Sequence, residues 1–144
     1  MNNPEDSCRD SVQAIVDCVS DVMDGDWGDR DWEQIVVNYE TLLHVPDEAT
    51  SAIAFSVARR RDGRHECVDF RLSDAAEDGL ERVKRDMHAQ SGTYWTTCTV
   101  TIERDGRYRF DYGYGAPYRL SGNVDDRRFA DYLKRYLAEK NGRQ

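Results

Sequence analysis

Two Asp-Gly pairs, each following a stretch of alternating apolar and polar residues, constrain the fold of this chain more than any other feature. Asp62-Gly63 follows residues 51–60, and Asp105-Gly106 follows residues 95–102. Glycine adopts the positive φ that tight turns require, and a short turn forces the segments on either side to pair as antiparallel strands. The sequence therefore predicts two β-hairpins.

The first hairpin is predicted to close with a two-residue type I′ turn at Asp62-Gly63. This turn sets three apolar residues of the first strand against three of the second, pairing Ile53 with Leu72, Phe55 with Phe70, and Val57 with Val68. Turn chemistry and apolar pattern agree on this register, which places these six side chains on one face.

The second hairpin favours a three-residue loop, Arg104-Asp105-Gly106, with Gly106 in the left-handed conformation. A two-residue loop would set Ile102 against a charged residue, Arg109. The longer loop instead gives three apolar pairs, which are Ile102 with Tyr108, Val100 with Phe110, and Cys98 with Tyr112. The opposite face is then expected to be solvated and to carry Thr97, Thr99, Thr101, Arg109 and Asp111.

Apolar spacing of three and four residues predicts helices over residues 6–23, 74–90 and 124–140. Ser73-Asp74 should begin the second helix and Gly92 should end it, while Asn123 should cap the third. Alternation of apolar and polar residues predicts one further strand over 33–43, followed by a turn at Pro46-Asp47. The expected order is α-β-β-β-α-β-β-α. We predict a two-layer α+β fold with an antiparallel meander sheet of about five strands and its helices on one face.

The length of 144 residues predicts a single domain over 1–144. No apolar run approaches the 18 residues that a membrane-spanning helix needs, and the first residues resemble no secretory signal. We therefore expect a cytoplasmic protein without a membrane partner. The four cysteines lack metal-ligand spacing and are interpreted as small buried residues. No motif indicates a cofactor, a metal site or a catalytic residue.

The net charge of −8 is concentrated at one end of the chain. Residues 1–33 hold ten acidic and two basic residues, whereas the remainder holds 18 of each sign. Binding to nucleic acid relies on Lys and Arg, so this balance argues against a nucleic-acid partner. It suits a basic protein partner, because an acidic surface speeds the encounter with one. The alternative is that the acids only keep the protein soluble.

The acidic stretch between the first helix and the first strand supplies the candidate partner-binding residues. They are Asp24, Asp26, Trp27, Asp29, Asp31 and Glu33. A Trp in an acidic loop flanked by glycines is poorly placed for a core and could anchor an interface. Trp27 could instead fold back over the first helix, and the carboxylates could form a solvated loop. Trp32 and Trp95 are interpreted as core residues.

Residues 95–112, with a Trp, a Thr-rich strand, an Asp-Gly turn and an aromatic strand ending at Asp111-Tyr112, resemble the central hairpin of the YezG-like antitoxins. These are immunity proteins of bacterial polymorphic toxin systems. Residues 31–37 resemble the first strand of that family, while the loop at 115–118 has no counterpart in it. The resemblance implies a protein that is not an enzyme and that binds a co-encoded toxin domain, often a nuclease.

Two other functions remain open at this point. A small enzyme or ligand-binding domain would need side chains brought together for acid–base chemistry, and Asp69, Asp111 and His65 are the residues that could form such a group. An acidic adaptor or nucleic-acid mimic outside toxin biology would use the same charge. The toxin's activity, the interacting face and the oligomeric state do not follow from the sequence.

Overall fold

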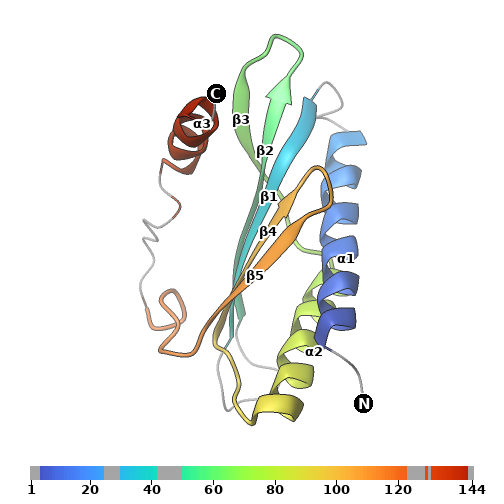
Figure 1. Cartoon of the computed structure of the whole chain (residues 1–144), viewed down its shortest axis with the longest axis vertical. Helices are drawn as coiled ribbons and strands as arrows, with labels where there is room; N and C mark the ends of the chain where they lie inside the picture. The colour runs from blue at the N-terminus through green and yellow to red at the C-terminus, as the bar shows by residue number, and fades with distance from the viewer. Residues whose placement is uncertain (1–3, 25–29, 42–49, 123–128, 130, 143–144) are drawn as a thin grey trace.

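The fold is described from a computed structural model covering residues 4–24, 30–41, 50–122, 129 and 131–142. The elements follow the predicted order. They are α1 (Pro4–Asp24), β1 (Arg30–Thr41), β2 (Thr50–Arg60), β3 (His65–Asp69), α2 (Asp74–Ser91), β4 (Thr97–Glu103), β5 (Tyr108–Gly113) and α3 (Tyr132–Gly142). The five strands form one antiparallel sheet in the order β3-β2-β1-β4-β5, so the predicted α+β class is confirmed (Figure 1).

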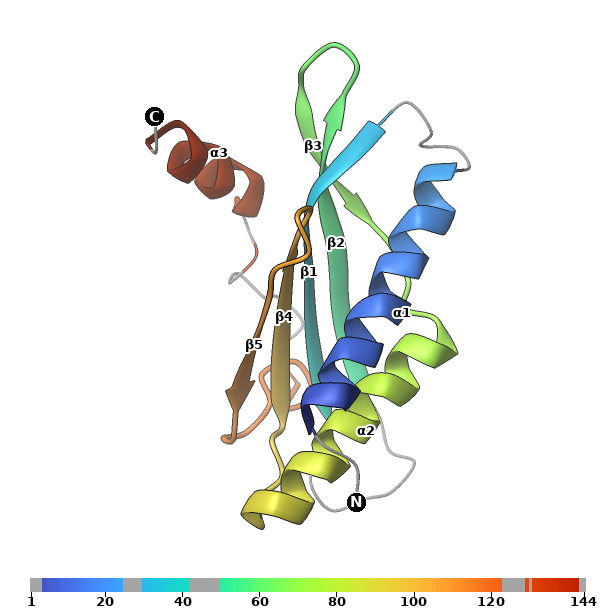
Figure 2. The ribbon, with the colours of Figure 1, turned by 45° about the vertical axis from the view of Figure 1, so that its right-hand side comes forward.

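Two hairpin-connected groups of strands meet at the centre of this sheet. The group β1-β2-β3 contributes its strand β1, which pairs with β4 of the group β4-β5. Helix α2 carries the chain from β3 at one edge to β4, and it packs beside α1 on one face of the sheet (Figure 2). Helix α3 lies on the other face (Figure 1). The expectation that the helices share one face therefore holds for α1 and α2 only.

The register of the β2–β3 hairpin differs from the prediction by one residue. Its loop contains three residues, Arg61-Asp62-Gly63, with Gly63 at φ 88°, and the Asp62 carboxylate accepts a hydrogen bond from the Arg64 amide at 2.9 Å. Phe55 consequently pairs with Asp69, and Val57 with Cys67. A three-residue loop whose last residue is left-handed is also a common hairpin connection, and Gly63 supplies that conformation.

This one-residue difference places Val68 and Phe70 on the same face of the sheet as Ala54 and Ser56, opposite Phe55. Alanines and Ser56 face α1 and α2, where Ala54 and Ala58 join the main core with Val68 and Leu72. Phe55 faces α3 instead, and its ring packs edge to face against Tyr132, with centroids 5.0 Å apart. The sheet thus has an apolar area on each face, and the second area explains why α3 lies opposite α1 and α2.

The β4–β5 hairpin has the predicted register. Ile102 pairs with Tyr108, Val100 with Phe110, and Cys98 with Tyr112. Gly106 has the expected positive φ of 98°. The opposite face carries the predicted polar residues, of which Arg109 and Asp111 are exposed and the three threonines are partly exposed.

The ends of α2 were also predicted correctly. The Ser73 side chain accepts a hydrogen bond from the Ala76 amide, and Gly92 ends the helix in the left-handed conformation. Helix α3 is shorter than predicted: it begins at Tyr132, and the residue before it, Asp131, has φ 59°, which is incompatible with an α-helix. The predicted cap Asn123 and the turn at Pro46-Asp47 lie outside the described residues.

Side-chain burial confirms most of the expected core. Trp95 is fully buried and Trp32 nearly so. All four cysteines are free thiols, and three are buried, but Cys67 is exposed on the edge strand β3, contrary to the expectation. Burial raises the pKa of the Cys98 thiol well above its usual value. Within the described ranges, no helix is long and apolar enough to cross a membrane.

Helices α1 and α2 approach most closely at Gly79. A Cβ atom at this position would lie 2.7 Å from Ser11 Oγ and 3.2 Å from Ser11 Cα. The Ser11 hydroxyl cannot easily move away, because it donates a hydrogen bond to the Ser7 carbonyl at 2.8 Å. Gly79 therefore lowers the helix propensity of α2 but permits the packing of the two helices.

We expect Gly79→Ala to lower the free energy of unfolding by about 1 kcal/mol or more, because overpacking outweighs the gain in helix propensity. Urea or thermal unfolding measures this change. The control is Ala89→Gly at an exposed position of the same helix, which changes propensity without a contact. A Gly79→Ala protein more stable than the wild type would contradict the close approach.

Candidate binding surface

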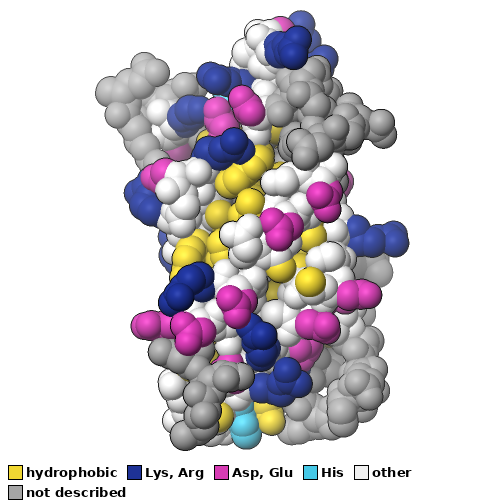
Figure 3. Space-filling view, turned by 90° about the vertical axis from the view of Figure 1, so that its right-hand side faces the viewer, with side chains coloured by type: hydrophobic (Ala, Val, Ile, Leu, Met, Phe, Trp, Pro, Cys, Tyr) yellow, Lys and Arg dark blue, Asp and Glu magenta, His cyan; other side chains and the backbone are white. Residues whose placement is uncertain are grey.

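The outer surface of the α1–α2 layer is predominantly acidic. Helix α1 carries six acidic residues and one basic residue, and α2 carries five acidic and three basic residues. The helices run antiparallel, as shown by the hydrogen bond from Ser7 to Asp86 and the contact of Cys18 with Ser73. Figure 3 shows carboxylate side chains spread over this face, with Lys and Arg side chains among them.

The charge is unevenly compensated along the layer. Near the N-terminus of α1, Asp10 forms an ion pair with Arg82 at 2.6 Å, and Asp6 pairs with Arg9 at 3.2 Å. The other half of the layer contains four exposed aspartates without an ion pair to any described residue. These residues, hereafter the aspartate cluster, are Asp17, Asp21, Asp74 and Asp78. The two helices bring them to the same half because Cys18 contacts Ser73, next to Asp74.

Helix stability accounts for only part of the aspartate cluster. Asp74 and Asp78 lie near the N-terminus of α2, where negative charge interacts favourably with the helix dipole. Asp21 lies near the C-terminus of α1, whose last turn has no basic residue, so its charge opposes the dipole at a cost of about 0.3–1 kcal/mol. The stability of α1 therefore does not explain an acidic residue at position 21, whereas attraction of a basic partner would explain it.

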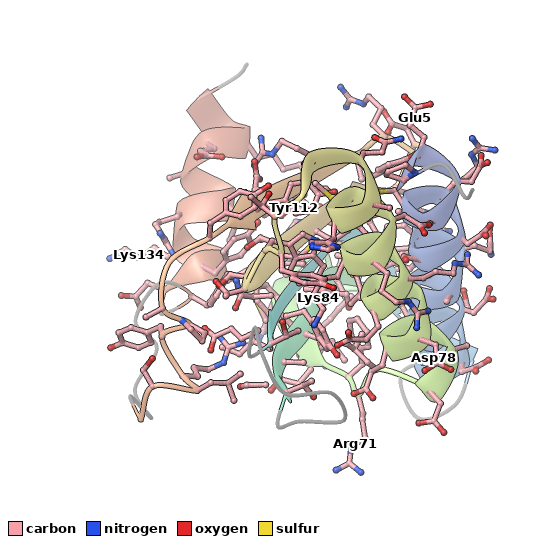
Figure 4. The ribbon with its side chains drawn as sticks, turned by 90° about the horizontal axis from the view of Figure 1, so that it is seen from below. Glu5, Arg71, Asp78, Lys84, Tyr112 and Lys134 are labelled. Carbon is pink, nitrogen blue, oxygen red and sulfur yellow. The ribbon has the colours of Figure 1, made fainter. Side chains whose placement is uncertain are left out.

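Helix α3, on the opposite face of the sheet, has a charge balance opposite to that of α1 and α2. Helix α3 contains three basic residues and one acidic residue. In the end-on view of Figure 4, Asp78 lies at the outside of the α1–α2 layer and Lys134 at the outside of α3, with the sheet between them. The acidic surface is therefore one face of the protein rather than a general property of its surface.

The six predicted site residues do not form one described group. Asp26, Trp27 and Asp29 lie outside the described residues, as does the side chain of Asp24, which ends α1. Asp31 is exposed on β1, in register with Arg59. Glu33 lies next to a bulge between Trp32 and Gln34 and turns toward α3.

Glu33 is surrounded by hydrogen-bond donors from β3 and α3. Its Oε1 atom lies 3.0 Å from His65 Nε2, 3.0 Å from the Tyr136 hydroxyl and 2.8 Å from Lys140 Nζ. The Arg59 guanidinium lies 3.9 Å from Oε2. Glu33 is thus an attachment point for α3, and its role in partner binding stays a prediction.

The environment of Glu33 changes its acidity. Partial burial acts to raise its pKa, but hydrogen bonds from Lys140 and Tyr136 and the charge of His65 outweigh burial, so the pKa lies below its usual value of 4.5. Burial and the hydrogen bond to Glu33 raise the pKa of Tyr136. The tyrosine therefore remains a neutral donor at physiological pH.

A depressed pKa in the folded state means that ionised Glu33 stabilises the protein above pH 4.5 and that this stabilisation is lost as the pH falls through the folded-state pKa. We expect Glu33→Gln to be less stable than the wild type at pH 7, with a difference that shrinks on acidification. Unfolding curves recorded between pH 7 and pH 3, alongside the exposed control Asp6→Asn, measure it. A difference independent of pH would contradict the ion-pair role.

A second carboxylate, Glu40, attaches the loop after β5 to the sheet. Glu40 is fully buried, and its Oε1 atom accepts hydrogen bonds from the amides of Arg119 and Leu120 at 2.8 and 3.1 Å. The Arg119 guanidinium lies 3.6 Å from Oε2 and donates to Ser51 Oγ at 2.7 Å and to the Asn38 carbonyl at 3.0 Å. Both buried charges are thereby compensated.

Because removal of one member of a buried ion pair leaves the other charge uncompensated, we expect Glu40→Ala to cost about 3–5 kcal/mol of stability. Asp6→Ala, which removes the exposed pair with Arg9, is the matched control and should change the unfolding midpoint far less. Denaturant unfolding measures both. Equal losses would contradict the structural importance of the Glu40–Arg119 pair.

The side chains named for a possible catalytic group do not converge. His65 and Asp69 lie on β3 at one edge of the sheet, while Asp111 lies on β5 at the other edge and pairs with Arg109 at 2.9 Å. His65 instead contacts Glu33. Among the described residues, no group of three His, Cys, Asp or Glu side chains is arranged to hold a metal ion.

Sequence reasoning missed the contribution of α2 to the acidic surface. It treated residues 34–144 as neutral because their charges balance in number, but the fold separates the acids of α2 from the bases of α3. The spacing of Asp74 and Asp78, one helical turn apart, was the available signal. The sequence contains no comparable signal for the contact between Glu40 and Arg119, since 78 residues separate them.

No protein-family model matches the chain, and no curated protein matches it. Evidence for the function therefore comes from the surface of the chain itself.

Proposed function

We propose that this chain is an immunity protein, or antitoxin, that binds a cognate toxin domain in the cytoplasm and occludes its positively charged working surface. The observation that carries this proposal is the exposed aspartate cluster on the α1–α2 layer, which no described cation neutralises. The partner that fits this surface is a basic protein domain, with a nuclease as the favoured type.

Electrostatics connects this surface with a nuclease. A nuclease holds phosphate groups with Lys and Arg, so its substrate groove is positively charged. A rigid helical layer that presents carboxylates can occupy such a groove in place of the nucleic acid, and its charge accelerates association. The same charge repels nucleic acid itself, so the chain competes with the substrate without binding it.

The position of Asp21 strengthens the argument. An acid near the C-terminus of α1 destabilises the helix, whereas asparagine would retain the size of the side chain without the charge. Functional surfaces commonly retain residues that stability alone would not favour. A role in partner recruitment accounts for this carboxylate, and packing does not.

The test begins with co-expression of the chain and the toxin domain encoded next to it. We expect cells to survive with the wild-type chain and to die without it. With the purified pair, we expect Asp17→Asn/Asp21→Asn to slow association at least about tenfold at low salt and to reduce the dependence of the rate on salt, because exposed charges act mainly on the association rate. Surface plasmon resonance or stopped-flow fluorescence measures the rates.

The matched control is Asp69→Asn/Glu139→Gln, which removes two exposed charges from β3 and α3 and should leave association nearly unchanged. The Asp17→Asn/Asp21→Asn protein should also be as stable as the wild type or more stable, which separates a binding defect from unfolding. Killing that is equal with and without the chain would overturn the proposed function. Equal slowing by both double variants would exclude the α1–α2 layer as the contact surface.

A further inference from the structure

The edge strand β5 leaves one row of backbone groups unpaired within the described chain. Next to the turn between β4 and β5, the Glu103 amide donates to the Arg107 carbonyl at 2.8 Å, so these two residues form a hydrogen-bonded pair of the ladder. Alternation along an antiparallel pair then directs the backbone groups of Arg109 and Asp111 toward β4 and those of Tyr108, Phe110 and Tyr112 outward. Figures 1 and 2 draw no labelled element along this outer edge.

The strand lacks several of the features that usually prevent edge pairing, and its two exposed charges, Arg109 and Asp111, are of opposite sign. β5 contains no proline and no lysine, and its register with β4 is continuous over six residue pairs. Its aromatic side chains form a row on the α1 side of the sheet, with Phe110 centroids 5.8 Å from Tyr108 and 6.2 Å from Tyr112. Tyr108, at the open end of the row, is 41% exposed.

The order of residues along β5 is complementary to itself. Arg109 and Asp111 flank Phe110 symmetrically and lie on the same face, with opposite charges. If a second copy pairs antiparallel about Phe110, each Arg109 faces Asp111 of the other copy, and each Tyr108 faces Tyr112 of the other copy. The residues with outward backbone groups then face one another, as the hydrogen-bonding pattern of an antiparallel ladder requires.

We propose that two copies of this chain associate through their β5 strands, forming a two-fold symmetric dimer with a continuous ten-stranded sheet. The Arg109–Asp111 contact at 2.9 Å within one chain is replaced by two cross-strand pairs between copies. The aspartate clusters remain outside this contact, because they lie on α1 and α2. The proposal does not depend on the proposed immunity function, and a dimer would present two acidic surfaces.

The wild-type chain should be dimeric by sedimentation equilibrium over a micromolar-to-millimolar range. In the Arg109→Asp variant, positions 109 and 111 are both acidic, so acidic residues of the two copies face one another. In the Asp111→Arg variant both positions are basic, so basic residues face one another. Each variant should therefore weaken dimerisation about tenfold or more. The double variant Arg109→Asp/Asp111→Arg restores complementarity and should dimerise nearly as well as the wild type. Both residues are exposed, so these variants should fold normally.

An equimolar mixture of the two single variants supplies the sharpest result. One variant carries two acids on the strand and the other two bases, so the mixture should form a heterodimer although neither variant dimerises alone. Amide hydrogen exchange at Tyr108, Phe110 and Tyr112 should slow as protein concentration rises. The amides of Arg109 and Asp111, paired with β4, should be protected at all concentrations.

Two outcomes would overturn the proposal. One is a wild-type chain that remains monomeric up to its solubility limit. The other is a dimer that both single variants form as well as the wild type, which would place the contact elsewhere on the molecule.

Discussion

The central strand β1 is the constraint on which the rest of the structure depends. It pairs with β2 on one side and β4 on the other, and a bulge between Trp32 and Gln34 determines which residues face each way. The bulge keeps Trp32 in the main core while Ile35, Val37 and Tyr39 also face that core. Glu33 and Glu40 are left for the other face, where they hold α3 and the loop after β5.

This arrangement gives the carboxylates of the chain different physical roles. Glu33 and Glu40 are surrounded by hydrogen-bond donors. Their negative charges are compensated within the molecule, where they hold the C-terminal segments against the sheet. The aspartate cluster on α1 and α2 forms no ion pair with any described residue. Only the second group produces a negative electrostatic potential that extends into solvent. The excess of acidic residues in the sequence therefore becomes a negative potential on one face of the protein.

The predictions that succeeded depended on local chemistry. Ser73 and Gly92 end α2 as their capping properties dictate, and the β4–β5 register follows from Gly106 and the apolar pairs beside it. The β2–β3 register failed because both faces of β2 are covered, so an apolar match with Val68 and Phe70 could not identify the core face. The single-face arrangement of helices failed with it, since Phe55 belongs to the contact with α3. The immunity function and the proposed family remain predictions.

The sequence by itself determined the class of fold, the order of elements and the ends of α2, because each depends on residues close together in the chain. It also determined the sign of the net charge, which is a sum that does not depend on the fold. Only the tertiary structure decided that α2 would extend the acidic surface of α1, that Glu33 would be neutralised by Lys140, and that Glu40 would bind Arg119. Those partners are separated by many residues, and their contacts depend on strand register and helix packing. A shift of one residue in a single turn changes the face on which a side chain lies.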